Sequence, residues 1–229
     1  RAAFILKSWN GDHKVNDIAP TIYYKLLSHV FKSAMEDELG ETDFNTLVNT
    51  HFMKNSYGAF LANDSSLWWD DIRTKDKKET RRDIFLEAFR NTINELKSSS
   101  GAMVNWTWGS AHTAEHVHPV GRMAPFDKIF NVGPSQVPGG IETINNAGFA
   151  LNTSGKYSVS YGPAMRILID FNDLYNGLSI LPTGQSGHIR SPYYQDQNAM
   201  YNAGKFRPML MEKEYIQKHC TNILTFIAK

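Results

Sequence analysis

The sequence is poor in cysteine, in long apolar runs and in net charge. Cys220 is the single cysteine among 229 residues, so no disulfide can form within the chain. No apolar run approaches the roughly 20 residues that a membrane-spanning helix needs. Lys and Arg number 24 against 23 Asp and Glu, which leaves a net charge of +1. A basic surface for nucleic acid is therefore not expected, and neither a membrane nor a nucleic acid is predicted as a partner.

Two features near the ends of the chain give further expectations. No charged segment followed by an apolar stretch opens the chain, so an export signal would lie upstream. Arg1 leads directly into an apolar element, which favours truncation or processing. Cys220 stands next to the apolar run 223–227 and is expected to be a small buried hydrophobe.

The composition is that of a folded protein with a substantial core. Hydrophobic residues make up 41% of the chain and aromatic residues 12%, which excludes a disordered or fibrous protein. The length suits one large domain or two small ones.

Residues 1–100 read as a helical segment. Apolar side chains recur at i and i+4 in three stretches, the pattern of amphipathic helices: residues 17–40, 43–61 and 77–97. The tryptophan-containing stretch 65–74 between them is expected to be an ordered loop anchored by its aromatic rings.

Residues 101–229 read as a β-rich segment. Glycine and proline separate short apolar stretches, and apolar residues alternate with others at 157–161 and, most clearly, at 165–171. A short helix is expected near 194–203 and a final strand at 222–227. The predicted fold class is α+β, with a helical first half and a sheet-rich second half.

Three histidines could carry chemistry in the stretch His112–His118. His112 and His116 would share a face of a helix, and His118 could complete a set of three zinc ligands. Pro119 and Gly121 follow at once, however, and no HExxH pattern is present. The favoured interpretation is structural histidines in a loop, and a metal-dependent hydrolase is the alternative.

Ser186 and His188 lie close together in the loop Gly184-Gln185-Ser186-Gly187-His188. The sequence is not the G-x-S-x-G nucleophile elbow, which also needs a preceding strand and a following helix. Two residues so close in sequence rarely bring a hydroxyl and an imidazole into productive geometry. A tightly turned loop, in which Gln185 and Ser186 bond nearby backbone, is predicted instead of a nucleophilic serine.

Arg166 and Asp170 lie on one face of the strand predicted at 165–171. At about 3.3 Å per residue they stand about 13 Å apart, too far to pair with each other. A buried charge needs a partner, so two separate structural ion pairs are predicted. The alternative is that both residues support an active site supplied by other segments.

A series of short motifs runs through nearly the whole chain in a specific order and spacing. These motifs are Leu6–Gly11, Ile18–Tyr23, Glu38–Gly40, Trp108–His112, His118–Gly121, Phe130–Pro134, Pro138–Gly140, Ile144–Asn146, Tyr161–Arg166, Leu181–His188 and Ser191–Gln197. The series resembles the C-terminal half of the large subunit of the penicillin amidase family, which includes penicillin, cephalosporin and acyl-homoserine-lactone acylases. Asn10 departs from the usual aspartate, and Ile189-Arg190 departs from a common Pro-Gly.

The resemblance implies part of a four-layer αββα N-terminal nucleophile hydrolase, in which residues 101–229 complete the core. In that family one precursor is cut into two subunits, and the large one begins with a serine or similar nucleophile. Its α-amino group, with a pKa near ~7.7, serves as general base. A backbone amide and an asparagine stabilise the oxyanion, and an acyl-enzyme is then hydrolysed.

The resemblance places none of that machinery in this chain. Arg1 has neither hydroxyl nor thiol, and the oxyanion asparagine is not carried over to Asn145 or Asn146, whose context differs. The family's calcium ligands also belong to earlier segments, so no cofactor or metal is expected here. The candidate residues are therefore supporting ones only: Arg166, Asp170, Gln185 and Ser186.

The sequence thus predicts part of an acylase that cleaves a linear amide and that lacks its nucleophile. Its expected partners are the upstream large-subunit residues, the small subunit and an acyl amide substrate, and its expected location is the bacterial periplasm or outside the cell. An unpaired sheet edge would make the isolated chain self-associate. The alternatives are a non-catalytic binding module on a borrowed acylase fold and the histidine-based metal hydrolase.

Overall fold

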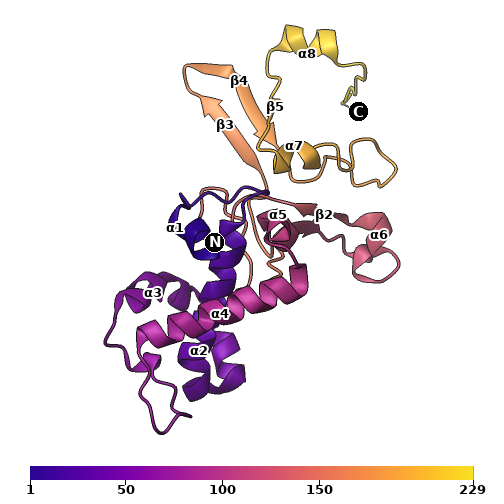
Figure 1. Cartoon of the computed structure of the whole chain (residues 1–229). Coiled ribbons are helices and arrows are strands. Elements are labelled where there is room, and N and C mark those ends of the chain that lie inside the picture. Colours follow the sequence, from indigo (N-terminus) through magenta and orange to yellow (C-terminus); the bar gives the residue numbers. More distant parts are fainter. Residues whose placement is uncertain (229) are drawn as a thin grey trace. The chain divides into compact units, whose positions relative to one another are not determined.

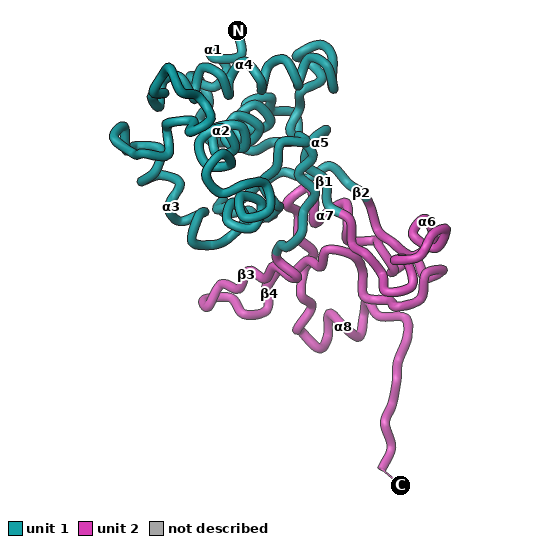
Figure 2. Tube along the Cα trace, turned by 90° about the horizontal axis from the view of Figure 1, so that it is seen from below, with its two compact units in different colours: residues 1–114, 134–162 teal, residues 115–133, 163–229 magenta. Residues whose placement is uncertain are grey.

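A computed structural model describes residues 1–228, which divide into two compact units (Figure 2). The first unit comprises residues 1–114 and 134–162, and the second comprises residues 115–133 and the chain from Pro163 on. This division follows contacts between residues. The boundary expected from the sequence at residue 100 separated a helical segment from a β-rich segment, and it stays a prediction.

The first unit is mainly helical (Figure 1). Its elements are α1 (Ala2–Lys7), α2 (Ala19–Val48), α3 (His51–Ala62), the 3₁₀ turn η1 (Leu67–Trp69), α4 (Arg81–Ser100), the 3₁₀ turn η2 (Met103–Asn105) and α5 (Trp108–Ala111). Helix α4 packs along α2, and α3 and η1 also contact α2. The helices bury two apolar clusters, a large one that includes Phe31, Trp69 and Trp108 and a small one formed by Ala2, Ile22, Leu96 and Trp106.

Helix α2 contains the predicted stop at Gly40 but does not end there. Gly40 has φ 72° and ψ 163°, a conformation that glycine adopts at little steric cost, and the helix resumes beyond it to Val48. The second predicted helix, 43–61, is interrupted where the Thr50 hydroxyl accepts a bond of 3.1 Å from the Met53 amide and begins α3. The break predicted at Gly40 is confirmed, because its backbone is non-helical and two helical stretches of α2 meet there at a kink.

Helix α4 begins four residues after the start predicted from the apolar stripe. Thr80 and Asp83 form a reciprocal capping box, with Thr80 N–H to Asp83 at 3.0 Å and Asp83 N–H to the Thr80 hydroxyl at 3.4 Å. Gly101, with φ 67°, follows the last helical residue. The predicted helix at 77–97 is confirmed, with both ends shifted toward the C-terminus.

The core of the first unit is rich in aromatic residues. Its largest fully buried side chains include Trp69, Trp106, Trp108, Tyr157 and Phe149. The indole of Trp69 is also fixed by a hydrogen bond of 2.7 Å to the backbone oxygen of Asn63. This confirms that the loop 65–74 is anchored by its aromatic rings.

Short strands and helices make up the rest of the described chain. The strands are β1 (Thr113–His116), β2 (Val132–Gln136), β3 (Arg166–Asp170), β4 (Asp173–Ile180) and β5 (Arg207–Pro208), and the helical elements are η3 (Val120–Arg122), α6 (Asp127–Phe130), α7 (Asn198–Asn202) and α8 (Lys213–His219). β1 pairs with β2, and β3, β4 and β5 form an antiparallel sheet in that order. Mixed helix and sheet confirms the predicted α+β class.

The strand predicted at 165–171 is β3, but two other predicted strands are absent from the described residues. At 157–161 the amides of Tyr157 and Val159 bond to Ala111 and Thr113, yet only an isolated bridge between Gly148 and Tyr161 forms. At 222–227 the chain is exposed and makes no strand. Alternation and apolarity alone do not make a strand when no partner strand lies in register.

Cys220 is exposed, which corrects the expectation that it is buried. It caps the C-terminal end of α8, a helix with no buried residue. The apolar run beside it, from which burial was inferred, is itself exposed. A small hydrophobe cannot be buried where its neighbours form no core.

Candidate functional site

The loop after β4 contains the serine and histidine that stand close in sequence. The Ser186 hydroxyl accepts a bond of 3.1 Å from the His188 amide, and the Ser186 amide donates to the Tyr193 carbonyl at 3.1 Å. The His188 ring nitrogen Nδ1 accepts a bond of 3.3 Å from the Arg190 amide. The Ser186 hydroxyl and the His188 imidazole thus bond to backbone amides and not to each other, which confirms the predicted turn at Ser186.

Gly184 is required at the start of this loop for steric reasons. A Cβ built on it would lie 2.1 Å from the Tyr193 carbonyl oxygen and 2.7 Å from an Asp196 carboxylate oxygen. Real Cβ atoms do not approach backbone so closely, so any larger residue would push the two sides of the loop apart. The same construction on Gly187 meets nothing within 4 Å.

A polar hollow of about 340 Å³ lies in the second unit beside this loop. Its lining residues are Gln185, Ser186, Ser191, Tyr193, Asp196, Gln197 and Arg207. Two of the predicted supporting residues, Gln185 and Ser186, are therefore brought together. Sequence reasoning did not assign Asp196 or Arg207 to this hollow, and Arg207 reaches it because β5 returns to pair with β4.

Gln197 is the buried residue that fixes this hollow. Its side-chain oxygen accepts a hydrogen bond of 3.0 Å from the Leu181 backbone amide, and its backbone amide donates one of 3.0 Å to the Thr183 carbonyl. The Asn198 side chain adds a bond of 2.8 Å to the Pro182 carbonyl. These bonds hold the segment after β4 against α7.

Arg166 and Asp170 lie in different surroundings. The Arg166 guanidinium lies 3.8 Å from the centre of the Tyr201 ring and donates a bond of 2.8 Å to the Tyr201 carbonyl. Burial raises the pKa of the Tyr201 hydroxyl, and the nearby Arg166 charge partly opposes that shift. Asp170 is exposed at the turn between β3 and β4 and accepts a bond from the Asn172 amide at 2.9 Å. Arg166 therefore holds α7 against the sheet, while Asp170 shapes the turn.

His112 is a fully buried histidine of the first unit. Its ring stacks on Trp108, with ring centres 4.5 Å apart, and its Nδ1 lies 2.7 Å from the Tyr157 carbonyl oxygen. A carbonyl oxygen can only accept a hydrogen bond, so Nδ1 carries the proton of the neutral ring. Nε2 is then unprotonated, and it has no hydrogen-bond partner. Burial lowers the pKa of His112 to about 4, so the ring is neutral at pH 7.

The other two histidines of that stretch serve different local structures. His116 is half-buried in β1, where burial lowers its pKa. The Nδ1 atom of His118 accepts a bond of 3.1 Å from the Val120 amide. Across residues 1–228 no group of three or more His, Cys, Asp or Glu side chains is placed to hold a metal ion. The geometry thus gives no support to the metal-hydrolase alternative.

Asn131 organises the connection between β1 and β2. Its side-chain oxygen accepts from the His118 amide at 3.0 Å, and its side-chain nitrogen donates to the Glu115 carboxylate at 3.1 Å. A Cβ built on Gly121 would come within 2.0 Å of the Asn131 side-chain oxygen. The glycine is therefore needed for this asparagine to reach the backbone.

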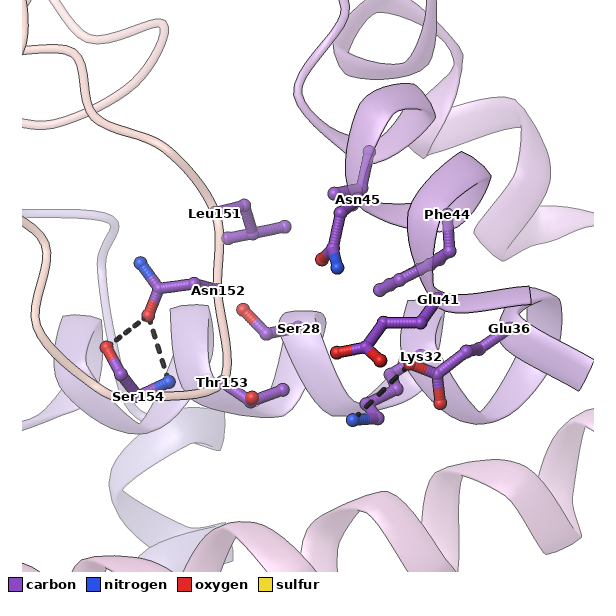
Figure 3. Close-up of a pocket in the computed structure, with 11 residues that line it drawn as sticks. Ser28, Lys32, Glu36, Glu41, Phe44, Asn45, Leu151, Asn152, Thr153 and Ser154 are labelled. Atoms are coloured by element: carbon purple, nitrogen blue, oxygen red, sulfur yellow. Dashed lines mark hydrogen bonds and ion pairs between the residues drawn. The ribbon is translucent and has the colours of Figure 1, made fainter. Parts of the chain in front are cut away.

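A second hollow, of about 200 Å³, lies within the first unit (Figure 3). Its walls are the two parts of α2 on either side of the Gly40 kink and the loop 151–154. Ser28, Phe44 and Leu151 form a buried floor, and Lys32 and Glu36 pair at 3.4 Å on the rim. The neighbouring Lys25 is buried and bonds Glu95 at 2.7 Å and the Thr153 carbonyl at 2.6 Å, which ties the loop to α2 and α4.

No helix in the described part of the chain has the length and apolar character needed to cross a membrane. This agrees with the absence of a long apolar run in the sequence.

Known proteins similar to this chain include acyl-homoserine lactone acylases, which match almost all of it, and a penicillin acylase, which matches less than half. An acyl-homoserine lactone acylase, QuiP, of Pseudomonas syringae pv. syringae is 26% identical over 227 residues, which cover 95% of this chain and 27% of the relative. The QuiP protein of Pseudomonas aeruginosa is 24% identical over 239 residues, with coverages of 94% and 28%. Penicillin acylase 2 proenzyme of Pseudomonas sp. (strain SE83) is 30% identical over 104 residues, 45% of this chain and 13% of that protein.

The fold is similar to that of a solved acylase. The thermostable penicillin G acylase from Alcaligenes faecalis matches 100% of this chain and 42% of its own chain, with a TM-score of 0.50 and 16% identity. The chain spans about a quarter of the length of the curated relatives that match most of it. The family model described as penicillin amidase matches residues 2–218. The chain therefore belongs to the penicillin amidase family.

Proposed function

We propose that this chain is part of an acylase that hydrolyses a linear amide through an acyl-enzyme, with the nucleophile supplied by residues outside it. The observation that carries this proposal is the match of the penicillin amidase family model to residues 2–218. The local geometry supports it too, because the Ser186 hydroxyl accepts from the His188 backbone amide, while the His188 ring Nδ1 accepts from the Arg190 amide.

The proposed substrate class is an N-acyl homoserine lactone. The relatives that match more than nine-tenths of the chain are acyl-homoserine lactone acylases, whereas the penicillin acylase proenzyme matches less than half of it. The nucleophile would attack the amide carbonyl, the C–N bond would break, and the amine would leave with a proton. Water would then cleave the acyl-enzyme to release the carboxylic acid and regenerate the nucleophile.

The proposed contribution of this chain is a framework, with no cofactor of its own. Arg166 would hold α7 on the sheet, Asp170 would shape the β3–β4 turn, and Gln185 with Ser186 would line the polar hollow. Its partners would be the remaining large-subunit residues and the small subunit. By analogy with the bacterial family members, the complete enzyme would act in the periplasm or outside the cell.

The test is hydrolysis by the complete precursor that contains this segment. We expect the full-length processed enzyme to release the fatty acid from a long-chain N-acyl homoserine lactone, measured by mass spectrometry of both products. A parallel assay with a phenylacetyl amide separates the two substrate classes. The purified segment, assayed as a control, should release nothing from either substrate.

Two results would contradict the proposal. Turnover by the segment unaided would place a nucleophile within it. A complete protein that binds acyl homoserine lactones but never cleaves them, with no serine or cysteine after a processing site, would instead favour a non-catalytic binding module.

A further inference from the structure

The chain contains two asparagine–glycine pairs, which the structure places in different surroundings. Asn10-Gly11 lies in the irregular loop between α1 and α2, and both residues are exposed. Asn176-Gly177 lies inside β4, where Gly177 is buried. In such a pair the backbone nitrogen of the glycine can attack the side-chain carbonyl carbon Cγ of the asparagine, because glycine has no Cβ to crowd the approach.

The side chain of Asn10 is held over the Gly11 peptide. Its oxygen Oδ1 accepts a hydrogen bond of 3.0 Å from the Asp12 backbone amide, which closes an Asx turn around the Gly11 nitrogen. The turn brings Cγ next to that nitrogen, and the Asp12 amide is placed to stabilise negative charge on Oδ1 during the attack. The Gly11 amide donates to no acceptor within the described residues, so its nitrogen is free to react.

The second pair has the glycine but not the turn. The side-chain nitrogen of Asn176 donates to the Asp173 carboxylate at 2.5 Å, which directs the side chain away from Gly177. The Gly177 carbonyl accepts a hydrogen bond of 2.8 Å from the Met209 amide, so the backbone here is held on the sheet. Closing a five-membered ring at this position would require the strand to give up its pairing.

Two other asparagines close the same turn without the glycine. Oδ1 of Asn63 accepts from the Ser65 amide at 3.0 Å, and Oδ1 of Asn152 accepts from the Ser154 amide at 2.9 Å. An aspartate and a threonine follow them, and their side chains crowd the attacking nitrogen. Within residues 1–228 the turn and the glycine therefore coincide only at Asn10.

We propose that Asn10 is a site of spontaneous deamidation in this enzyme. The Gly11 nitrogen bonds to Cγ of Asn10 and gives up its proton, and the bond from Cγ to Nδ2 breaks. Nδ2 leaves as ammonia with that proton, and a five-membered imide remains. Water then opens the imide at Cγ, which yields aspartate, or at the backbone carbonyl carbon, which yields isoaspartate. Solvent water is the only co-reactant, no atom is oxidised or reduced, and the chemistry does not depend on the proposed function.

Isoaspartate at position 10 would disturb the first unit through His13. The ring atom Nδ1 of His13 lies 2.8 Å from the Gly11 carbonyl oxygen, and Nε2 lies 3.1 Å from the Tyr24 hydroxyl. The His13 carbonyl accepts a hydrogen bond of 3.0 Å from the Gly139 amide. Isoaspartate adds a carbon to the backbone and moves Gly11, whereas aspartate keeps the backbone and can close the same turn.

The test is incubation of the full-length processed enzyme at mildly alkaline pH, with peptide mass spectrometry to follow the deamidation of each asparagine. In the folded enzyme we expect Asn10 to convert at least about tenfold faster than Asn176. In urea, where both pairs lie in an open chain, the two rates should be similar. Equal rates in the folded enzyme would overturn the proposal, and so would an Asn10 rate that is lower in the folded enzyme than in urea.

Hydrogen exchange separates the effects of the two products. The variant Asn10→Asp carries the new charge on an unchanged backbone, and its Gly139 amide should exchange at the wild-type rate. In enzyme that has accumulated isoaspartate, measured by enzymatic methylation of that residue, the same amide should exchange at least about tenfold faster. Equal exchange in the two forms would refute the displacement of His13.

Discussion

Acidification should destabilise this protein through His112, which is buried in its neutral form. The ordinary histidine pKa of 6.5 falls to about 4 in the folded protein, so below pH 6.5 the unfolded state binds a proton that the folded state does not. Stability conferred by the neutral ring is therefore complete above pH 6.5 and is lost as the pH falls toward 4. A shift of this size corresponds to about 3 kcal/mol in total and to about 2 kcal/mol between pH 7 and pH 5.

The assay is urea unfolding followed by tryptophan fluorescence at pH 7, 6 and 5, because Trp108 stacks on the His112 ring. His112→Phe keeps a flat ring but cannot titrate, so it should remove about 2 kcal/mol of the pH dependence. The same variant leaves the Tyr157 carbonyl without its donor and should lose about 1–3 kcal/mol at pH 7. If wild-type and variant stabilities fall in parallel from pH 7 to pH 5, the assigned neutral burial of His112 is refuted.

Three further substitutions test the fold. Lys25→Met should lower the free energy of unfolding by about 1–3 kcal/mol, because the Lys25 ammonium is buried against a carboxylate. Lys32→Met, in a partly exposed helical pair, should change it by about 0.5 kcal/mol or less, and urea unfolding compares the two variants. Gly184→Ala should lower the free energy of unfolding by roughly 1–3 kcal/mol, because the new Cβ would lie 2.1 Å from a backbone oxygen. The matched variant Gly187→Ala meets nothing within 4 Å and should leave the melting temperature nearly unchanged in a thermal melt. Thr80→Ala removes the capping hydroxyl of α4 and should lower the free energy of unfolding by about 1 kcal/mol, measured by circular dichroism during urea unfolding. An unchanged free energy of unfolding would contradict the capping role of Thr80.

Local sequence patterns predict the long helices, β3 and α7 of this fold, and they miss β4 and β5. The apolar stripe identifies α2 and α4, and alternation identifies β3, because a helix of many turns or a full strand repeats its period several times. The two-residue β5 has no period to detect. The break at Gly40 was located correctly, but whether the chain leaves the helix or resumes it after a kink depends on packing, which the local sequence does not encode.

The same reasoning explains what could be predicted of the candidate site. Gln185 and Ser186 were found because they lie in one recognisable glycine-rich turn. Arg207, which completes the same polar hollow, is more than twenty residues away and joins it only because β5 returns to pair with β4. Its neighbourhood is set by a long-range strand pairing, which no local pattern encodes.

The residues that carry the family resemblance share a physical role: they satisfy buried or strained backbone. Trp108 donates from its indole to the Gly139 carbonyl at 2.8 Å, and His112 donates to the Tyr157 carbonyl. Asn145 donates to the Pro138 carbonyl at 2.9 Å, and Gln197 accepts from the Leu181 amide. Each of these side chains supplies a backbone group with the hydrogen bond that a regular strand or helix would otherwise provide. A buried backbone group left without a hydrogen-bond partner would lower the stability of the fold by about 1–3 kcal/mol. Motifs of this kind therefore fix irregular segments of the backbone.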